Sequence, residues 1–151
     1  RTSVSLTCSD LIRASPQATP YTVSALPSAA VQIAAGQHNS YAMLVDGSVW
    51  AWGRNGQGQL GDGTTQRNSP VRIEGYGADT AMRLPPGGVW PPTMFVVAAD
   101  GTAMGSGRND DGQLGNGGTD DVVTAGAIPE LGGGIVEIAR GGQHTLVLKG
   151  E

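Results

Sequence analysis

The chain has 151 residues, enough for one domain with a reasonable core. It contains 25 glycines and 9 prolines, only 15% of its residues are charged, and the apolar 38% comes in short clusters, so short strands joined by tight turns fit best. No apolar run approaches the roughly 18 to 20 residues of a membrane span, and the net charge of −4 disfavours binding to nucleic acid.

Residues 1–30 are interpreted as the end of a preceding repeat. Pro20 lies 11 residues before Val31, just as Pro70 lies 11 residues before Ala81. The first residues, 2–8, alternate polar and apolar side chains as a strand does, with Val4 and Leu6 on one face. We expect this strand to be a possible interaction element.

The first full repeat is expected over residues 31–80. Here 41–45 and 48–52 are predicted strands that flank Asp46-Gly47, a dipeptide whose tolerance of positive φ suits a tight hairpin. A glycine-rich loop follows, and then a further short strand after Pro70. With the strand before residue 41, this unit is predicted to be a four-stranded antiparallel sheet.

The unit recurs further along the chain. Residues 46–65 match 100–119 without a gap at an offset of 54, and residues 31–44 match 136–149 at an offset of 105. We therefore expect a second repeat over 81–135, with a Pro-rich insertion at 85–92, and the start of a third over 136–151. A period of about 50 residues predicts a repeat architecture.

The repeated motif resembles the repeats of the regulator of chromosome condensation family. The resembling residues are Ile33-Ala34-Ala35-Gly36, Asp46-Gly47, Trp50-Ala51-Trp52-Gly53, Asn55, Gly58-Gln59-Leu60-Gly61, Ser69-Pro70 and Ile138-Ala139-Arg140-Gly141-Gly142-Gln143-His144-Thr145-Leu146. The resemblance implies an all-β fold of β-propeller blades, about three here, where the family closes typically seven. Because propellers need roughly four to eight blades, we expect a partial propeller or part of a larger array.

Structural roles in every blade are predicted for the residues that recur in register. They are Gly36, Asp46, Gly47, Trp50, Trp52, Gly53, Asn55, Gly58, Leu60, Gly61, Asp100, Gly101, Gly107, Asn109, Gly112, Leu114, Gly115, Gly141 and His144. Trp50 and Trp52 share one strand face, which favours packing between blades. Trp90 lies in the Pro-rich insertion and is equally compatible with a contact anchor or with a cap on its own blade.

No catalytic, cofactor or metal site is predicted. Residues 56–61 spell G-x-G-x-x-G, but no helix follows to bind a pyrophosphate, and Asp110 replaces the first glycine in the second copy. Asp110-Asp111 and Asp120-Asp121 lack the ligand spacing of a calcium loop. The two histidines, His38 and His144, are expected to make turn hydrogen bonds, and the lone Cys8 excludes an internal disulfide and a multi-cysteine metal site.

These observations favour a non-catalytic, structural protein-interaction module with no nucleic-acid partner and no membrane span. We expect it to self-assemble, or to be completed by strand exchange with a neighbouring chain or by the rest of a propeller, with the strand at residues 2–8 completing the last blade. The alternative is a guanine-nucleotide exchange or targeting fragment of a larger signalling protein. If the protein is secreted, Ser15-Pro16, Thr19-Pro20 and Ser69-Pro70 are possible O-linked glycan sites.

Overall fold

The computed structural model describes residues 5–6, 21–36, 38–64, 66–74, 81–84 and 92–150. It is an all-β chain, as predicted, and among the described residues one 3-10 turn, η1 (Pro129–Leu131), is the sole helical element. The strands are β1 (Ser5–Leu6), β2 (Tyr21–Thr22), β3 (Ala30–Ala35), β4 (Asn39–Leu44), β5 (Val49–Arg54), β6 (Gln66–Arg72), β7 (Ala81–Arg83), β8 (Thr93–Ala98), β9 (Ala103–Gly107), β10 (Val122–Ala127), β11 (Ile135–Arg140) and β12 (Thr145–Lys149).

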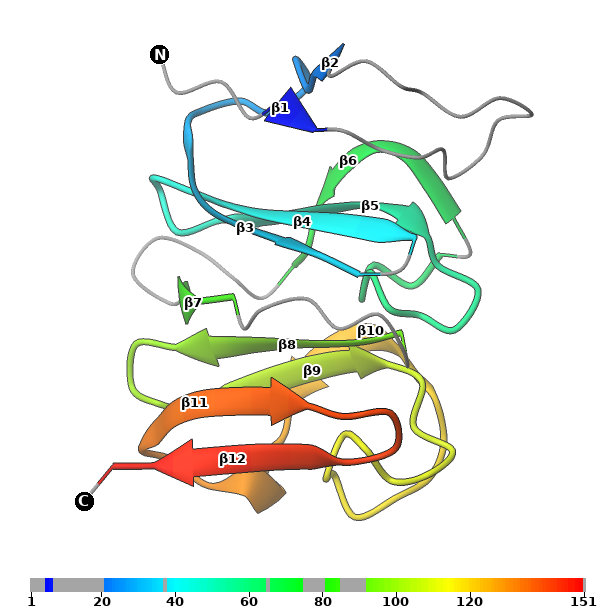
Figure 1. The fold of residues 1–151 in the computed structure, drawn as a ribbon, viewed down its shortest axis with the longest axis vertical. Coiled ribbons are helices and arrows are strands. Elements are labelled where there is room, and N and C mark those ends of the chain that lie inside the picture. Colours follow the sequence, from blue (N-terminus) through cyan, green and yellow to red (C-terminus); the bar gives the residue numbers. More distant parts are fainter. Residues whose placement is uncertain are drawn as a thin grey trace.

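The strands form two complete blades and two half-blades, all antiparallel. Blade A has the order β3-β4-β5-β6, and blade B runs in the same sense from β7 to β10. We call the pair β1-β2 the amino-terminal half-blade and the pair β11-β12 the carboxy-terminal half-blade. Figure 1 shows these sheets stacked, with β1 and β2 at one end of the stack and β11 and β12 at the other.

The Asp-Gly dipeptides form the hairpins between the second and third strands of each complete blade. Gly47 has φ 77 and Gly101 has φ 76, a conformation that glycine adopts without strain. The carboxylate of Asp46 accepts bonds from the backbone N–H and the hydroxyl of Ser48, and Asp100 accepts the same pair from Thr102. Each hairpin is thus held by its own aspartate.

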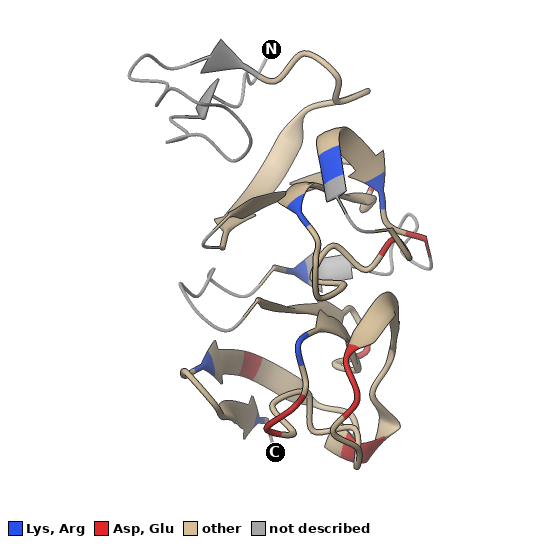
Figure 2. Cartoon of the chain, turned by 90° about the vertical axis from the view of Figure 1, so that its right-hand side faces the viewer, with Lys and Arg blue, Asp and Glu red and all other residues tan. Residues whose placement is uncertain are grey.

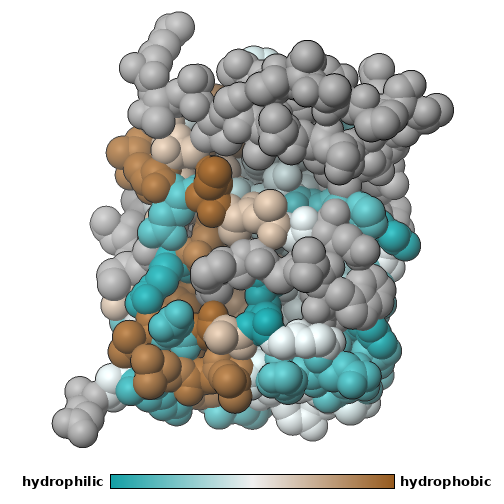
Figure 3. All heavy atoms as spheres, viewed as in Figure 1, coloured by the Kyte–Doolittle hydropathy of each residue, from teal (hydrophilic) through white to brown (hydrophobic). Residues whose placement is uncertain are grey.

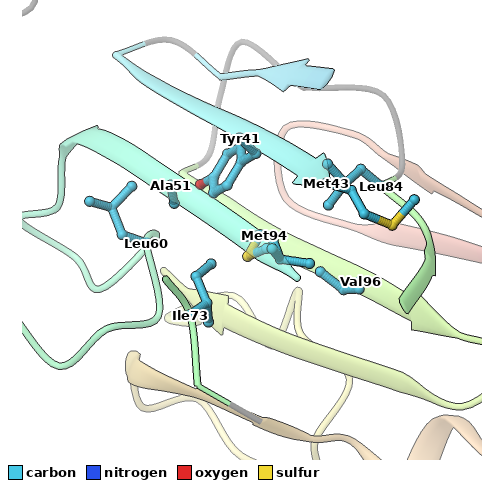
Figure 4. Packing of buried hydrophobic residues seen from close by; sticks show 9 residues of the cluster. Tyr41, Met43, Ala51, Leu60, Ile73, Leu84, Met94 and Val96 are labelled. Carbon is cyan, nitrogen blue, oxygen red and sulfur yellow. The ribbon is translucent and has the colours of Figure 1, made fainter. Parts of the chain in front are cut away.

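The central strands bury both of their faces. Tyr41 and Met43 of β4 point toward blade B, where they pack with Met94 and Val96 of β8 in one apolar cluster (Figure 4). The alternate residues of β8, Phe95 and Val97, point the other way and pack with β11. Since successive side chains of a strand face opposite sides, each blade needs a neighbour on both sides.

The segment after β2 covers the other face of blade A. Val23 and Leu26 pack against Ala42, Leu44 and Trp52 in a third apolar cluster. This packing repeats the arrangement after the fourth strands of the complete blades, where Ile73 and Ile128 join the clusters with the following blade.

The glycine-rich loop of blade A also makes backbone hydrogen bonds to blade B. The backbone N–H of Gly63 donates to the carbonyl of Val123 (2.9 Å), and the N–H of Ala125 donates to the carbonyl of Gly61 (2.9 Å). Asp62 and Thr124 form the β-bridge between these two bonds. The loop therefore adds to the outer edge of β10 as a short extra strand.

One strand begins earlier than the sequence suggested, and another begins where the predicted insertion ends. β6 starts at Gln66, ahead of Pro70, because an outermost strand leaves one row of N–H groups unpaired and tolerates a proline there. β8 starts at Thr93, so the repeat resumes directly after the Pro-rich insertion. Residues 85–91 of that insertion lie outside the described residues.

Three loop glycines differ in whether they need a positive φ and in whether an added Cβ would collide with another atom. A Cβ on Gly56 meets nothing and needs no positive φ; on Gly117 it meets nothing but φ is +76; on Gly58, also at φ +76, it collides with Val123 Cα. We predict a graded loss of stability in urea unfolding. Gly56→Ala changes it by less than about 0.5 kcal/mol, Gly117→Ala costs about 1 kcal/mol, and Gly58→Ala costs more than Gly117→Ala. Equal effects of Gly117→Ala and Gly58→Ala contradict the described contact with β10.

Candidate interaction surface

A buried asparagine organises each glycine-rich loop. The side-chain oxygen of Asn55 accepts the N–H of Leu60 (2.7 Å), and its amide nitrogen donates to Asp62 Oδ1 (2.7 Å) and to the carbonyl of Thr64 (2.6 Å). Gln59 turns back on the same loop, where its Oε1 accepts the N–H of Gln57. The loop therefore holds its own backbone in the shape that reaches β10.

Blade B builds the same loop 54 residues later. Asn109 accepts the N–H of Leu114 (2.9 Å) and donates to Asn116 Oδ1 (2.9 Å) and the carbonyl of Gly118 (3.1 Å). Both asparagines are fully buried, and so are Leu60 and Leu114 beside them. The two asparagines and the two leucines therefore occupy equivalent positions in the two blades.

The two loops differ at the position opposite the asparagine. Asp62 pairs with Arg67 (2.7 Å) and accepts from Thr64, whereas its counterpart Asn116 has no charge. Burial raises the pKa of Asp62, but the bonds from Arg67 and Thr64 outweigh it and hold this pKa below its ordinary value of 3.8. The ion pair belongs to blade A alone.

Acidic residues gather on the loop of blade B. Arg108 donates to Asp110 (2.5 and 2.6 Å) and lies 3.8 Å from Asp111, while Asp121 accepts the N–H of Asn109. Figure 2 shows most of the acidic residues in the lower half of the chain. Within the described ranges, no three His, Cys, Asp or Glu side chains come together as a metal site.

Both histidines accept backbone hydrogen bonds, His38 at the end of the β4–β5 pairing and His144 in the turn between β11 and β12. The carbonyl of His38 accepts the N–H of Arg54, and that of His144 accepts the N–H of Gly141. Asn39 stands where His144 stands, because Asn39 accepts the N–H of Gly36 in the same way. A Cβ on Gly36 or Gly141 would collide with the side chain of Asn39 or His144, respectively.

The structure describes some of the residues that were predicted to make contacts, and others lie outside the described residues. Trp50 and Trp52 both lie in the cluster between blade A and the segment before it. Leu6 lies in β1, paired with Tyr21, so within this chain β1 pairs with β2 and not with β12. Val4 and Trp90 lie outside the described residues.

One contact between blades departs from the repeat. Arg140 of β11, where blade A has Ala35, donates from its guanidinium to the carbonyl of Thr93 in blade B. Burial raises the pKa of Tyr41 above its ordinary value, and the charge of Arg140 opposes this rise. Burial lowers the pKa of Arg140, and Tyr41 opposes that shift. In the sequence, this contact is indicated by the arginine at position 140, where the first repeat has Ala35.

The largest difference in exposure between equivalent apolar residues of the repeat lies on the outer face of the carboxy-terminal half-blade. Leu146 is 65% exposed and Leu148 57%, although their counterparts at an offset of 105, Tyr41 and Met43, are 4% and 5% exposed. Figure 3 shows hydrophobic atoms over the lower left of the molecule, where β11 and β12 lie in Figure 1. We call Glu137, Ala139, Leu146 and Leu148 the end face.

A polar group accompanies the apolar ones in this face. In blade A the side-chain oxygen of Gln32 accepts the backbone N–H of Leu84 in the next blade (2.8 Å). Glu137 occupies the equivalent position of β11, where it also pairs across to the strand residue that matches Met43. A carboxylate accepts the same kind of bond as the glutamine oxygen.

An open groove runs along the outer strand of blade A. It has a volume of about 440 Å³ and is lined by Arg67, Asn68, Ser69, Pro70 and Val71. These residues correspond, at an offset of 55, to the strip of β10 that receives the glycine-rich loop of blade A.

The possible O-linked glycan sites stay predictions. Ser69 is exposed in the structure, whereas Ser15 and Thr19 lie outside the described residues.

Comparison with known families decides what these blades are. The model of the regulator of chromosome condensation (RCC1) repeat matches residues 46–80 and 100–148, and a second model of that repeat matches 30–59. The chain belongs to the RCC1 repeat family. The matched ranges cover blade A, strands β9 and β10 of blade B, and the carboxy-terminal half-blade.

Curated relatives match this chain over part of much longer chains. The RCC2 homolog of Danio rerio is 34% identical over 112 residues, which is 73% of this chain and 22% of the relative. The probable E3 ubiquitin-protein ligase HERC6 of Homo sapiens is 32% identical over 126 residues, or 78% of this chain and 12% of the relative. The chain therefore spans about a fifth of the first relative and less of the second.

Solved structures of RCC1-like propellers share the fold. Human WBSCR16 superposes with a TM-score of 0.76 at 26% identity, over 90% of this chain and 34% of that one. Prp20p of Saccharomyces cerevisiae superposes with a TM-score of 0.76 at 20% identity, over 95% of this chain and 37% of that one. The described residues include no helix of the length and apolar character that a membrane-crossing helix requires.

Blade B supplies the control for the ion pair of blade A. Asp62→Asn installs the residue found at 116, keeps an acceptor for Asn55, and is predicted to cost less than about 1 kcal/mol at pH 7. Asp62→Ala leaves an amide hydrogen of Asn55 without its acceptor and is predicted to cost about 1 to 3 kcal/mol. Urea unfolding of both variants measures the difference.

The contribution of Asp62 to stability depends on pH. Because the folded pKa of Asp62 lies below the ordinary value of 3.8, its contribution to stability is complete above that value and is lost as the pH falls through the folded pKa. We predict that Asp62→Asn flattens the stability profile below pH 4 relative to the natural chain. An identical acid limb in both proteins contradicts the assignment.

Proposed function

We propose that this chain is a non-catalytic protein-interaction module that binds through its end face. A neighbouring blade, supplied by another chain or by the remainder of a propeller, completes the carboxy-terminal half-blade and packs on it. The module is built to be extended rather than to carry out chemistry, and its recurring loops serve to join one blade to the next.

The exposure of Leu146 and Leu148 carries this proposal. The equivalent side chains are buried against a following blade in both complete blades, as Tyr41 and Phe95 show at 4% and 2% exposure. Burying a leucine side chain contributes about 1.5 to 3 kcal/mol. Two leucines on one half-blade therefore favour an occupant of the same shape as blade B.

The edge of β12 supports the same conclusion. In blade A the second strand, β4, pairs on both sides, with β3 and β5, whereas among the described residues β12 pairs with β11 alone. A strand edge with unpaired N–H and C=O groups is a template for strand addition. Apolar packing and main-chain pairing thus act on the same half-blade.

Two of the similar solved structures support protein partners. Prp20p of Saccharomyces cerevisiae binds Gsp1p and histones, and another structure shows yeast RCC1 (Prp20) bound to Kap60. The described loops recur in two blades, which suits a scaffold better than a single catalytic constellation. Accelerated nucleotide release from a small GTPase in the presence of this chain would contradict the non-catalytic proposal.

The proposed role of the end face can be tested in a protein to which a further blade segment is joined. Glu151 corresponds to Asp46 at an offset of 105, so a second copy of residues 47–98 joined after Glu151 continues the repeat. In this extended protein we predict that Leu148→Ala costs about 2 to 5 kcal/mol in urea unfolding, because its side chain is now buried.

Val45 provides the matched control. It is an exposed apolar residue at the hairpin of blade A, so Val45→Ala is predicted to change the stability of the extended protein by less than about 0.5 kcal/mol. A cost for Leu148→Ala as small as that for Val45→Ala means that the added blade does not pack on the end face and overturns the proposed function.

A further inference from the structure

We infer that Asn116 is a site of spontaneous deamidation, and that a blade docked on the end face slows this reaction. The second half of the inference rests on the proposed function, because it needs a docked blade. The first half rests on the loop of blade B alone. Its central observation is that the dipeptide Asn-Gly occurs twice in this chain, at residues 55–56 and 116–117, in two different environments.

Deamidation uses the backbone nitrogen of the following residue as the nucleophile. The nitrogen of Gly117 bonds to Cγ of Asn116, its proton passes by way of water to Nδ2, and the Cγ–Nδ2 bond breaks with release of ammonia. Water then opens the cyclic imide at one of its two carbonyls, which leaves aspartate or isoaspartate. Glycine in the second position favours the attack, because no Cβ crowds the nitrogen.

Two donors already polarise the side-chain carbonyl of Asn116. Its Oδ1 accepts hydrogen bonds from the amide nitrogen of Asn109 (2.9 Å) and from the backbone N–H of Gly118 (3.2 Å). As the nitrogen of Gly117 attacks Cγ, negative charge develops on this oxygen, and donors aimed at the developing charge lower the barrier. The bond from Gly118 also folds the side chain back alongside the peptide group of Gly117.

The leaving nitrogen of Asn116 is not held in place. Asn116 is half-buried and Gly117 is exposed. Within the part of the chain that the structure describes, Nδ2 of Asn116 donates to no acceptor. A Cβ at Gly117 would meet nothing within 4 Å, so water has access to the attacking nitrogen. No hydrogen bond of the side-chain nitrogen therefore has to break before ammonia leaves.

Asn55 holds the same dipeptide in a protected state. It is only 1% exposed, and its amide nitrogen donates to Asp62 Oδ1 (2.7 Å) and to the carbonyl of Thr64 (2.6 Å). Both bonds must break, and the loop must open to water, before ammonia can leave. We therefore expect Asn55 to deamidate at least about tenfold more slowly than Asn116.

The reaction changes the charge of the loop of blade B. Its aspartate product has the same residue type as Asp62 in blade A, which pairs with Arg67. Val122 occupies the position of Arg67 in blade B, and Asp121 already stands beside it. The new carboxylate therefore lacks the cation that Asp62 has, and isoaspartate also lengthens the main chain by a methylene group.

A docked blade engages the attacking nitrogen itself. In blade A the counterpart of Gly117 is Gly63, whose N–H donates to the carbonyl of Val123 in the next blade (2.9 Å). The N–H of Gly117 has no acceptor among the described residues. By the repeat, a blade on the end face presents the equivalent carbonyl, which in the extended protein belongs to the added copy of Asn68. We expect this hydrogen bond to slow deamidation about two- to tenfold.

Peptide mass spectrometry of the 151-residue chain tests the site. During incubation in neutral buffer we expect Asn116 to convert to aspartate and isoaspartate at least about tenfold faster than Asn55. In urea the two dipeptides are expected to react at similar rates, because the fold no longer distinguishes them. Equal rates in the folded chain, or a preference for Asn116 that persists unchanged in urea, would overturn the inference.

Two glycine variants separate nitrogen attack from instability of the loop. Gly117→Ala places a methyl group beside the attacking nitrogen and is expected to slow deamidation of Asn116 at least about tenfold, although its loss of stability alone would speed the reaction. Gly56→Ala is expected to leave the rate at Asn116 unchanged. Deamidation of Asn116 that continues at the same rate in Gly117→Ala contradicts the mechanism.

The extended protein distinguishes failure of the inference from failure of the proposed function. If Leu148→Ala is costly there but Asn116 deamidates as fast as in the 151-residue chain, the end face accepts a blade and only the protection is wrong. If Leu148→Ala is as mild as Val45→Ala, the proposed function is wrong and the protection with it. The rates at Asn116 and Asn55 in the 151-residue chain decide the first half in either case.

Discussion

Burial of both faces of each sheet is the constraint on which the rest of the structure depends. Alternate residues of β4 and β8 enter two different apolar clusters, so neither side of a blade faces water. A sheet of this kind cannot satisfy its own surface. The fold must therefore continue until it closes or until something else covers the last face.

The glycine-rich loop makes this stacking specific. It contributes backbone hydrogen bonds to β10, where a side chain on Gly58 or Gly61 would collide with the strand. Apolar packing alone allows sliding between sheets, whereas paired backbone groups set a register. The loop is held in place by Asn55, so a buried polar side chain within one blade determines how the next blade is positioned.

Much of this architecture could be predicted because the residues that build it recur. The turns at Gly47 and Gly101, and the asparagines at 55 and 109, stand in register and do the same work in both blades. Arg140 and the pair Asp62–Arg67 could not be predicted, because each departs from its counterpart in the repeat, Ala35 or Asn116. Their partners come from other blades or from a bulged strand, which spacing does not reveal.

Completion of the carboxy-terminal half-blade requires that the free edge of β12 is paired in the assembled protein. Hydrogen exchange of the amides of Leu146, Val147 and Leu148 tests this most directly, since consecutive amides of a strand point to opposite edges. We predict slow exchange at all three. An alternation of slow and fast exchange along β12, as expected for a strand paired with β11 alone, would contradict it.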